Sequence, residues 1–109
     1  MTRTRYYLGL TTRDGKPVDD GQRADAVATA AYAHAGGCTV YRATGYWRGA
    51  TGYWRGTREE TLVLEALDVD GYESPVSDAL ARSLGAIMEQ DTVLWTREEV
   101  AGGFVKVPR

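Results

Sequence analysis

The sequence predicts an α+β protein with the ferredoxin-like order β-α-β-β-α-β, in which an antiparallel sheet carries both helices on one face. Three observations predict this order. The N-terminal stretch alternates with period two, two later stretches place apolar residues at helical spacing, and two strand-like stretches lie between these helices. The chain has 109 residues, which is room for a single domain spanning 1–109.

The first strand and the first helix follow from residue spacing. Residues 3–12 alternate between the two sides of an extended chain, and an Asp-Gly turn signal at 14–15 ends the strand. Either Asp19 or Asp20 can cap a helix that ends at Gly36-Gly37. The apolar stripe of this helix consists of Ala24, Val27, Ala28, Ala31 and Ala35.

The second half of the chain predicts a hairpin, a helix and one or two strands. Residues 38–48 and 57–67 are rich in Thr, Val, Tyr, Trp and Leu and are joined by a glycine-punctuated reversal. Ser74-Pro75 predicts the start of a helix that ends near Gln90. Its stripe is Val76, Leu80, Leu84, Ile87 and Met88. Residues 92–96 predict the fourth strand, and Phe104 to Val107 a short extra one.

The sheet face that the helices leave open is expected to be partly apolar. Residues 62–64 (Leu-Val-Leu) and 93–95 (Val-Leu-Trp) place hydrophobic side chains on both sides of their strands. We expect a second copy of the chain to cover this face.

A tandem repeat is the most unusual feature of the sequence. Residues 43–49 (Ala-Thr-Gly-Tyr-Trp-Arg-Gly) are repeated without change at 50–56. Two seven-residue copies cannot form a solenoid, but a reversal at 49–52 would let the copies pair as an extended hairpin arm, with Trp47 facing Trp54. The candidate binding residues are Tyr46, Trp47, Arg48, Tyr53, Trp54 and Arg55.

The composition of this arm favours contact with a partner. Segment 42–58 has four arginines and no acid, whereas the whole chain carries a formal charge of −2. Aromatic rings beside guanidinium groups suit interface hot spots, base stacking, or pairing with carboxylates and phosphates. Two structural explanations stay open. The aromatic residues stabilise the arm itself or a neighbouring subunit, or the duplication has no role.

The other reactive residue types have structural explanations. The single cysteine, Cys38, excludes an intrachain disulfide, and with His34 it is too few ligands for zinc, so no metal or cofactor is expected. His34 lies near the end of the first helix, where the dipole favours it. Glu59-Glu60 and Glu98-Glu99 are adjacent pairs whose members point to opposite faces, so we expect solvent or arginine pairing rather than a catalytic dyad.

The chain is expected to be cytoplasmic, because its start lacks the apolar run of a signal peptide and no later stretch is long enough to span a membrane.

Four segments resemble a group of short uncharacterised bacterial and actinobacteriophage proteins. They are Tyr-Tyr-Leu-Gly-Leu at 6–10, Thr-Val-Tyr at 39–41, the Gly-Tyr-Trp-Arg-Gly hairpin, and Glu-Glu-Thr-Leu-Val-Leu at 59–64. The resemblance spans about residues 5–97 and implies a ferredoxin-like fold, a phage origin and no particular activity. The doubled heptad departs from the single Gly-x-Trp-x-Gly of that group.

The sequence therefore favours a non-enzymatic binding or assembly protein. It would form homo-oligomers and contact a partner, such as a host protein, through the open sheet face and the arm. Two alternatives remain. The arm binds single-stranded nucleic acid, or the protein is a cofactor-free enzyme or small-molecule binder with a cavity at the sheet and His34 or Tyr7 at its edge.

Overall fold

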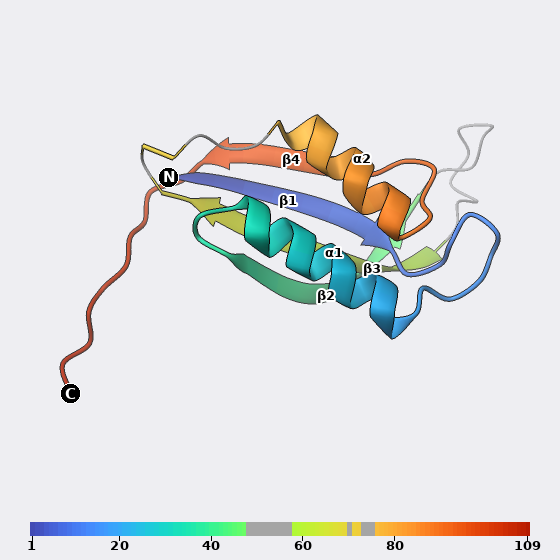
Figure 1. The fold of residues 1–109 in the computed structure, drawn as a ribbon, viewed down its shortest axis with the longest axis horizontal. Helices are drawn as coiled ribbons and strands as arrows, with labels where there is room; N and C mark the ends of the chain where they lie inside the picture. The colour runs from blue at the N-terminus through green and yellow to red at the C-terminus, as the bar shows by residue number, and fades with distance from the viewer. Residues whose placement is uncertain (48–57, 70, 73–75) are drawn as a thin grey trace.

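The computed structural model describes residues 1–47, 58–69, 71–72 and 76–109. Its elements follow the order β1 (Thr2–Gly9), α1 (Asp20–Ala33), β2 (Cys38–Tyr46), β3 (Arg58–Asp68), α2 (Ser77–Ile87) and β4 (Leu94–Glu99). The four strands form one antiparallel sheet in the order β2-β3-β1-β4. Both helices cover the same face of it (Figure 1). The predicted ferredoxin-like α+β fold is confirmed.

The first helix begins as its capping residues predict. The Asp19 carboxylate accepts a hydrogen bond from the backbone nitrogen of Gln22, whose side chain in turn accepts one from the backbone nitrogen of Asp19. This reciprocal capping box satisfies two amide groups that the helix itself cannot pair. Since the helix ends at Ala33, His34 becomes its C-cap.

The second helix is shorter than predicted. It begins at Ser77 with Val76 as its N-cap and ends at Ile87, whereas the sequence predicted Ser74-Pro75 and an end near Gln90. Ser74 and Pro75 lie outside the described residues. Glu89 has a positive φ of 52°, a left-handed conformation that ends the helical path before Gln90.

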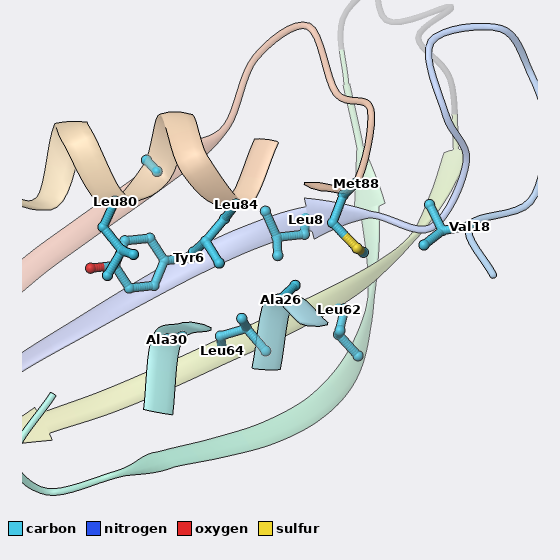
Figure 2. Packing of buried hydrophobic residues seen from close by; sticks show 11 residues of the cluster. Tyr6, Leu8, Val18, Ala26, Ala30, Leu62, Leu64, Leu80, Leu84 and Met88 are labelled. Atoms are coloured by element: carbon cyan, nitrogen blue, oxygen red, sulfur yellow. The ribbon is translucent and has the colours of Figure 1, made fainter. Parts of the chain in front are cut away.

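The core lies between the helices and the covered face of the sheet. Tyr6 and Leu8 from β1 and Leu62 and Leu64 from β3 meet small alanines on α1 and larger side chains on α2 (Figure 2). Because Ala26 and Ala30 add little bulk, α1 can approach the sheet closely. The predicted stripe of this helix is wrong, since Ala24, Ala28 and Ala35 are exposed and the sheet lies against the face with Ala26 and Ala30. The buried cluster is Tyr6, Leu8, Val18, Ala26, Ala30, Leu62, Leu64, Leu80, Ala81, Leu84 and Met88.

A buried polar cluster connects the end of α1 to the sheet. The Tyr6 hydroxyl lies 3.0 Å from Nε2 of His34, and Nδ1 of His34 lies 2.9 Å from the Asp68 carboxylate. The backbone nitrogen of Ala35 donates to the other Asp68 oxygen at 3.1 Å. All three side chains are buried, so each needs these partners to offset its lost hydration. The cluster secures the helix end to β1 and β3.

The open face contains an apolar row across its middle. Tyr41, Val63, Tyr7 and Leu94 are successive cross-strand partners in the order β2-β3-β1-β4. Val63 is fully buried within this row, while Tyr41 and Leu94 are exposed. The prediction of hydrophobic side chains on both sides of the 62–64 stretch is therefore confirmed.

The predicted strand at Phe104 to Val107 is wrong, because these residues form no strand in the structure. The ladder between β1 and β4 ends where Met1 and Val100 exchange backbone hydrogen bonds. Beyond that point no strand of the sheet runs alongside the chain, and the segment extends away from the body (Figure 1). Among the described residues, no helix is long and apolar enough to cross a membrane.

Candidate functional site

Most of the predicted arm lies outside the described residues, which end at Trp47 and resume at Arg58. Tyr46 is the last residue of β2, opposite Arg58 on β3, and Trp47 follows it directly. Trp54 is among the residues outside the described part, so the predicted pairing of Trp47 with Trp54 stays a prediction. The candidate binding residues affected are Arg48, Tyr53, Trp54 and Arg55.

A cavity of about 440 Å³ lies at one end of the open face. It forms where β1 ends, β3 begins and the loop after α2 leads into β4. Tyr7 and Trp47 supply aromatic surface, Glu59 and Asp91 supply carboxylates, and Arg13 supplies a guanidinium group. The size is within the range of small-molecule sites.

Trp47 reaches this cavity because Gly45 has no side chain. A Cβ added at Gly45 would lie 2.9 Å from the indole nitrogen of Trp47 and 3.1 Å from the Thr61 hydroxyl. The indole therefore lies against the strand near Gly45 and Thr61. The side chain is 42% exposed, so part of its surface stays available to a ligand.

Glu59 is the carboxylate that faces into the cavity from the sheet. It lies on β3 opposite Gly45, and its carboxylate packs against the Cα of Gly9 at the end of β1. Burial raises the pKa of the Glu59 carboxyl above its ordinary value of 4.5. Within the part of the chain that the structure describes, no cation forms an ion pair with it, so it can meet a cationic ligand.

The other acids of the two adjacent pairs behave as the sequence predicted. Glu60 faces the opposite side of β3 and lies 3.4 Å from Arg58. Glu98 pairs with Arg3 and, at 3.6 Å, with Arg5, and the hydrogen bond from Arg3 lowers the pKa of the Glu98 carboxyl. The expectation of solvent or arginine pairing is wrong only for Glu59. Sequence spacing identifies the face of a strand, but it cannot show which position borders a cavity.

Gln90 positions the backbone that surrounds the cavity. Its side-chain oxygen accepts from the backbone nitrogen of Gly9 at 3.0 Å, and its side-chain nitrogen donates to the carbonyl of Thr11 at 3.1 Å. Arg13 lies 3.4 Å from Asp91 and 3.3 Å from the carbonyl of Gln90. These contacts join the loop after β1 to the loop before β4, so the cavity wall is built from two distant parts of the chain.

Gly9→Ala should disrupt this site more than the fold. The new methyl group would collide with the Glu59 carboxylate and lie 2.6 Å from the side-chain oxygen of Gln90. Both are ends of flexible side chains, so they can move at a cost of about 1 kcal/mol in the free energy of unfolding. Because Glu59 would be displaced from the cavity, we expect a cationic ligand there to bind about tenfold or more weakly, while urea denaturation shows a loss of only about 1 kcal/mol in the free energy of unfolding. Full binding by the variant would contradict this placement of Glu59.

The structure also separates the other predicted candidates. Tyr7 lines the cavity, whereas His34 is held in the buried cluster with Tyr6 and Asp68, on the other side of the sheet. Cys38 is partly buried against the core, and burial raises the pKa of its thiol, which disfavours the reactive thiolate. Both residues therefore have structural roles, and His34 is held by Tyr6 and Asp68, two partners that the predicted helix-dipole explanation did not include.

Two solved structures share this fold. A phage SAM lyase in complex with S-methyl-5′-thioadenosine aligns with a TM-score of 0.66 and 17% identity, covering 90% of this chain and 80% of the lyase chain. A phage SAM lyase in the apo state aligns with a TM-score of 0.63 and 16% identity, covering 89% and 78%. No protein-family model matches the sequence, and no curated protein matches it either.

This comparison corrects the non-enzymatic interpretation. The chain was expected to be a non-enzymatic binding or assembly protein, but two solved structures that share its fold are of an enzyme. The alternative interpretation of the sequence, a small-molecule binder or enzyme with a cavity at the sheet, agrees better with this comparison and with the cavity beside Glu59.

Proposed function

We propose that this chain binds S-adenosylmethionine in the cavity and cleaves it to release S-methyl-5′-thioadenosine. The observation that carries the proposal is the partly buried Glu59 carboxylate in a cavity with aromatic walls. The shared fold with a phage SAM lyase supports the choice of ligand.

The charges around the cavity match this ligand. A sulfonium ion is a compact cation, and carboxylate and aromatic surfaces both attract cations. Glu59, Tyr7 and Trp47 supply these surfaces. The amino-acid end of the substrate carries one ammonium and one carboxylate, for which Asp91 and Arg13 are complementary partners.

The proposed reaction requires no external electron donor or acceptor. The bond between sulfur and the γ carbon of the four-carbon group breaks, and both electrons go to sulfur, which becomes a neutral thioether. In the same step the γ carbon either accepts an electron pair from the carboxylate oxygen of the same group, giving a lactone, or forms a double bond to the β carbon with the electrons of the C–H bond whose proton leaves. We assign Glu59, which lines the cavity, as the group that accepts that proton in the second route and holds the cation in both.

The test uses the purified full chain with S-adenosylmethionine and no other reagent. We expect S-methyl-5′-thioadenosine to accumulate in proportion to protein concentration, measured by liquid chromatography. Mass spectrometry of the four-carbon product separates the lactone from the alkene. If the protein neither releases the thioether nor binds S-adenosylmethionine in calorimetry, the proposal is wrong.

Binding of the sulfonium ion is expected to depend on pH, because the Glu59 carboxyl attracts the cation only when it is ionised. Burial raises the pKa of this carboxyl, so it ionises at higher pH than an exposed glutamate. We expect kcat/KM for S-adenosylmethionine to be low in acid and to rise with pH, with a midpoint above 4.5. Binding of the uncharged product should not show this rise. An identical pH profile in Glu59→Gln would assign the titration to another group.

A further inference from the structure

We infer that Gln90 is a positioning residue for Glu59, because its side-chain amide pairs with the end of β1 beside that carboxylate. The inference rests on the proposed function, since it concerns how the cavity holds the group that would bind the sulfonium ion. Gln90 lies in the loop between α2 and β4 and lines the cavity itself. Three observations support the inference: where the ladder between β1 and β4 ends, which bonds the amide makes, and which glycine Gln90 and Glu59 both contact.

The end of β1 extends past its ladder with β4. The last pair of that ladder is Tyr7 and Leu94, although β1 continues to Gly9. On its other side Gly9 lies opposite Thr61 of β3. A backbone N–H that is buried without a partner costs about as much free energy as a lost hydrogen bond. Because Gly9 is buried beyond the reach of β4, its backbone nitrogen needs an acceptor from outside the sheet.

The Gln90 side chain supplies the partners that β4 does not reach. Its oxygen accepts a hydrogen bond from the backbone nitrogen of Gly9 at 3.0 Å. Its nitrogen donates to the carbonyl oxygens of Thr11 at 3.1 Å and Met88 at 2.9 Å. An amide suits this place because it combines an acceptor with two donors. An ionised carboxylate of the same length would accept from Gly9 but could not donate to either carbonyl.

Gly9 is the residue that brings Gln90 and Glu59 together. A Cβ added at Gly9 would lie 2.6 Å from the Gln90 side-chain oxygen and would collide with Oε1 of Glu59. Both side chains therefore use the space that this glycine leaves open. Because Gln90 accepts the hydrogen bond from Gly9, the Glu59 oxygens stay available to a ligand. A carboxylate that accepted this N–H itself would be stabilised in its ionised form and would be a weaker base.

Gln90 supports Glu59 without adding a charge to its surroundings. The titratable or charged groups that border Glu59 come from several elements and are Tyr7 on β1, Arg13 after β1, Arg23 on α1, Arg42 on β2, Arg58 on β3 and Asp91 before β4. The carboxylate of Asp91 lies 3.4 Å from Arg13. A second carboxyl at position 90 would be the nearest acid to Glu59, since both would lie against Gly9.

The test replaces Gln90 with glutamate in the full chain. When protonated, the new carboxyl can accept from Gly9 and donate to Thr11 as the amide does. When ionised, it cannot donate, and it repels Glu59. We expect Gln90→Glu to change the rising pH profile of kcat/KM for S-adenosylmethionine into a bell-shaped one, with a fall of about tenfold or more on the alkaline side. A profile that rises and stays high would overturn the inference.

A second variant makes the test independent of lyase activity. Gln90→Met keeps the length of the side chain but leaves the Gly9 N–H without its acceptor, so the adjacent Glu59 carboxylate is expected to accept it. We expect the titration midpoint of Glu59, followed by carbon-13 NMR of its carboxyl group, to be lower than in the wild type. An unchanged midpoint overturns the inference even if the chain cleaves S-adenosylmethionine. A lowered midpoint in a chain that cannot cleave it supports the inference and contradicts only the proposed function.

Gln22→Met is the matched control. Gln22 is the other glutamine of the chain, and its side chain also joins two backbone groups, the nitrogen of Asp19 at 3.0 Å and the carbonyl oxygen of Ile87 at 3.1 Å. It lies on α1, away from the cavity lining. We expect Gln22→Met to lower the urea concentration at half-unfolding but to leave the Glu59 midpoint unchanged. A shift of this midpoint equal to that in Gln90→Met would show a general effect of lost stability and would overturn the inference.

Discussion

Glu59→Gln is expected to reduce kcat/KM for S-adenosylmethionine by about 100-fold or more. The change keeps the size of the side chain but removes the negative charge that would hold the sulfonium ion and accept a proton. The measurement is the initial rate of S-methyl-5′-thioadenosine release over a range of substrate concentrations. Binding of the neutral product should change little, because it carries no charge for Glu59 to meet.

Glu60→Gln is the matched control. Glu60 is the next residue on the same strand, but it faces the opposite side and lies beside Arg58. We expect its substitution to leave kcat/KM within about twofold of the wild type. Equal losses in both variants would show a general effect of charge rather than a site at Glu59.

The stability of Glu59→Gln provides another check. Burial raises the pKa of this carboxyl, so the folded state binds its proton more tightly than the unfolded state does. Stability from this group is therefore present at low pH and is lost as the pH rises through the raised pKa. The glutamine variant lacks this loss, so at neutral pH it should be at least as resistant to urea as the wild type. A less active but more stable variant is typical of a functional site.

Asp68→Ala is expected to lower the free energy of unfolding by about 3–5 kcal/mol. The substitution leaves Nδ1 of His34 and the backbone nitrogen of Ala35 without the acceptors that they contact at 2.9 Å and 3.1 Å. Asp68 and His34 are both almost completely buried, so water cannot replace the lost partner without opening the fold. Since a domain of this size has a total stability of about 5–15 kcal/mol, this change takes a large share of it. Urea denaturation followed by circular dichroism measures the loss.

Asp78→Ala is the control for this prediction. Asp78 forms an exposed ion pair with Arg82 at 2.7 Å on α2, a pair of the kind that contributes little in water. We expect its loss to change the free energy of unfolding by at most about 0.5 kcal/mol. A similarly small effect of Asp68→Ala would show that the buried cluster does not stabilise the end of α1.

Local patterns were sufficient to predict most of the fold. The alternation of residues 3–12 located β1, and Asp19 capped α1 as its side chain and position required. These signals succeed because backbone hydrogen bonding and side-chain periodicity depend on near neighbours in the sequence. The prediction of an extra strand at Phe104 to Val107 was wrong because it used only near neighbours in the sequence. A strand also needs a neighbouring strand, and a local pattern contains no information about one.

The candidate site could not be predicted in this way. Glu59 and Glu60 are identical in residue type and adjacent in sequence, yet one borders a cavity with a raised pKa and the other lies beside Arg58 in solvent. The difference depends on Gly9, on Trp47 lying near Gly45, and on the Gln90 side chain. These groups come from three separate parts of the chain, all distant in sequence from Glu59.

By itself, the sequence determined the succession of strands and helices and the local excess of arginine and aromatic residues, but it did not determine which face of α1 is buried. Only the tertiary structure decided that His34 is held between Tyr6 and Asp68 and that Glu59 faces the cavity. The physical reason is that burial and charge environment are set by residues that are distant in sequence and brought together by the sheet. A carboxylate acquires a raised pKa from the surroundings that the fold builds around it.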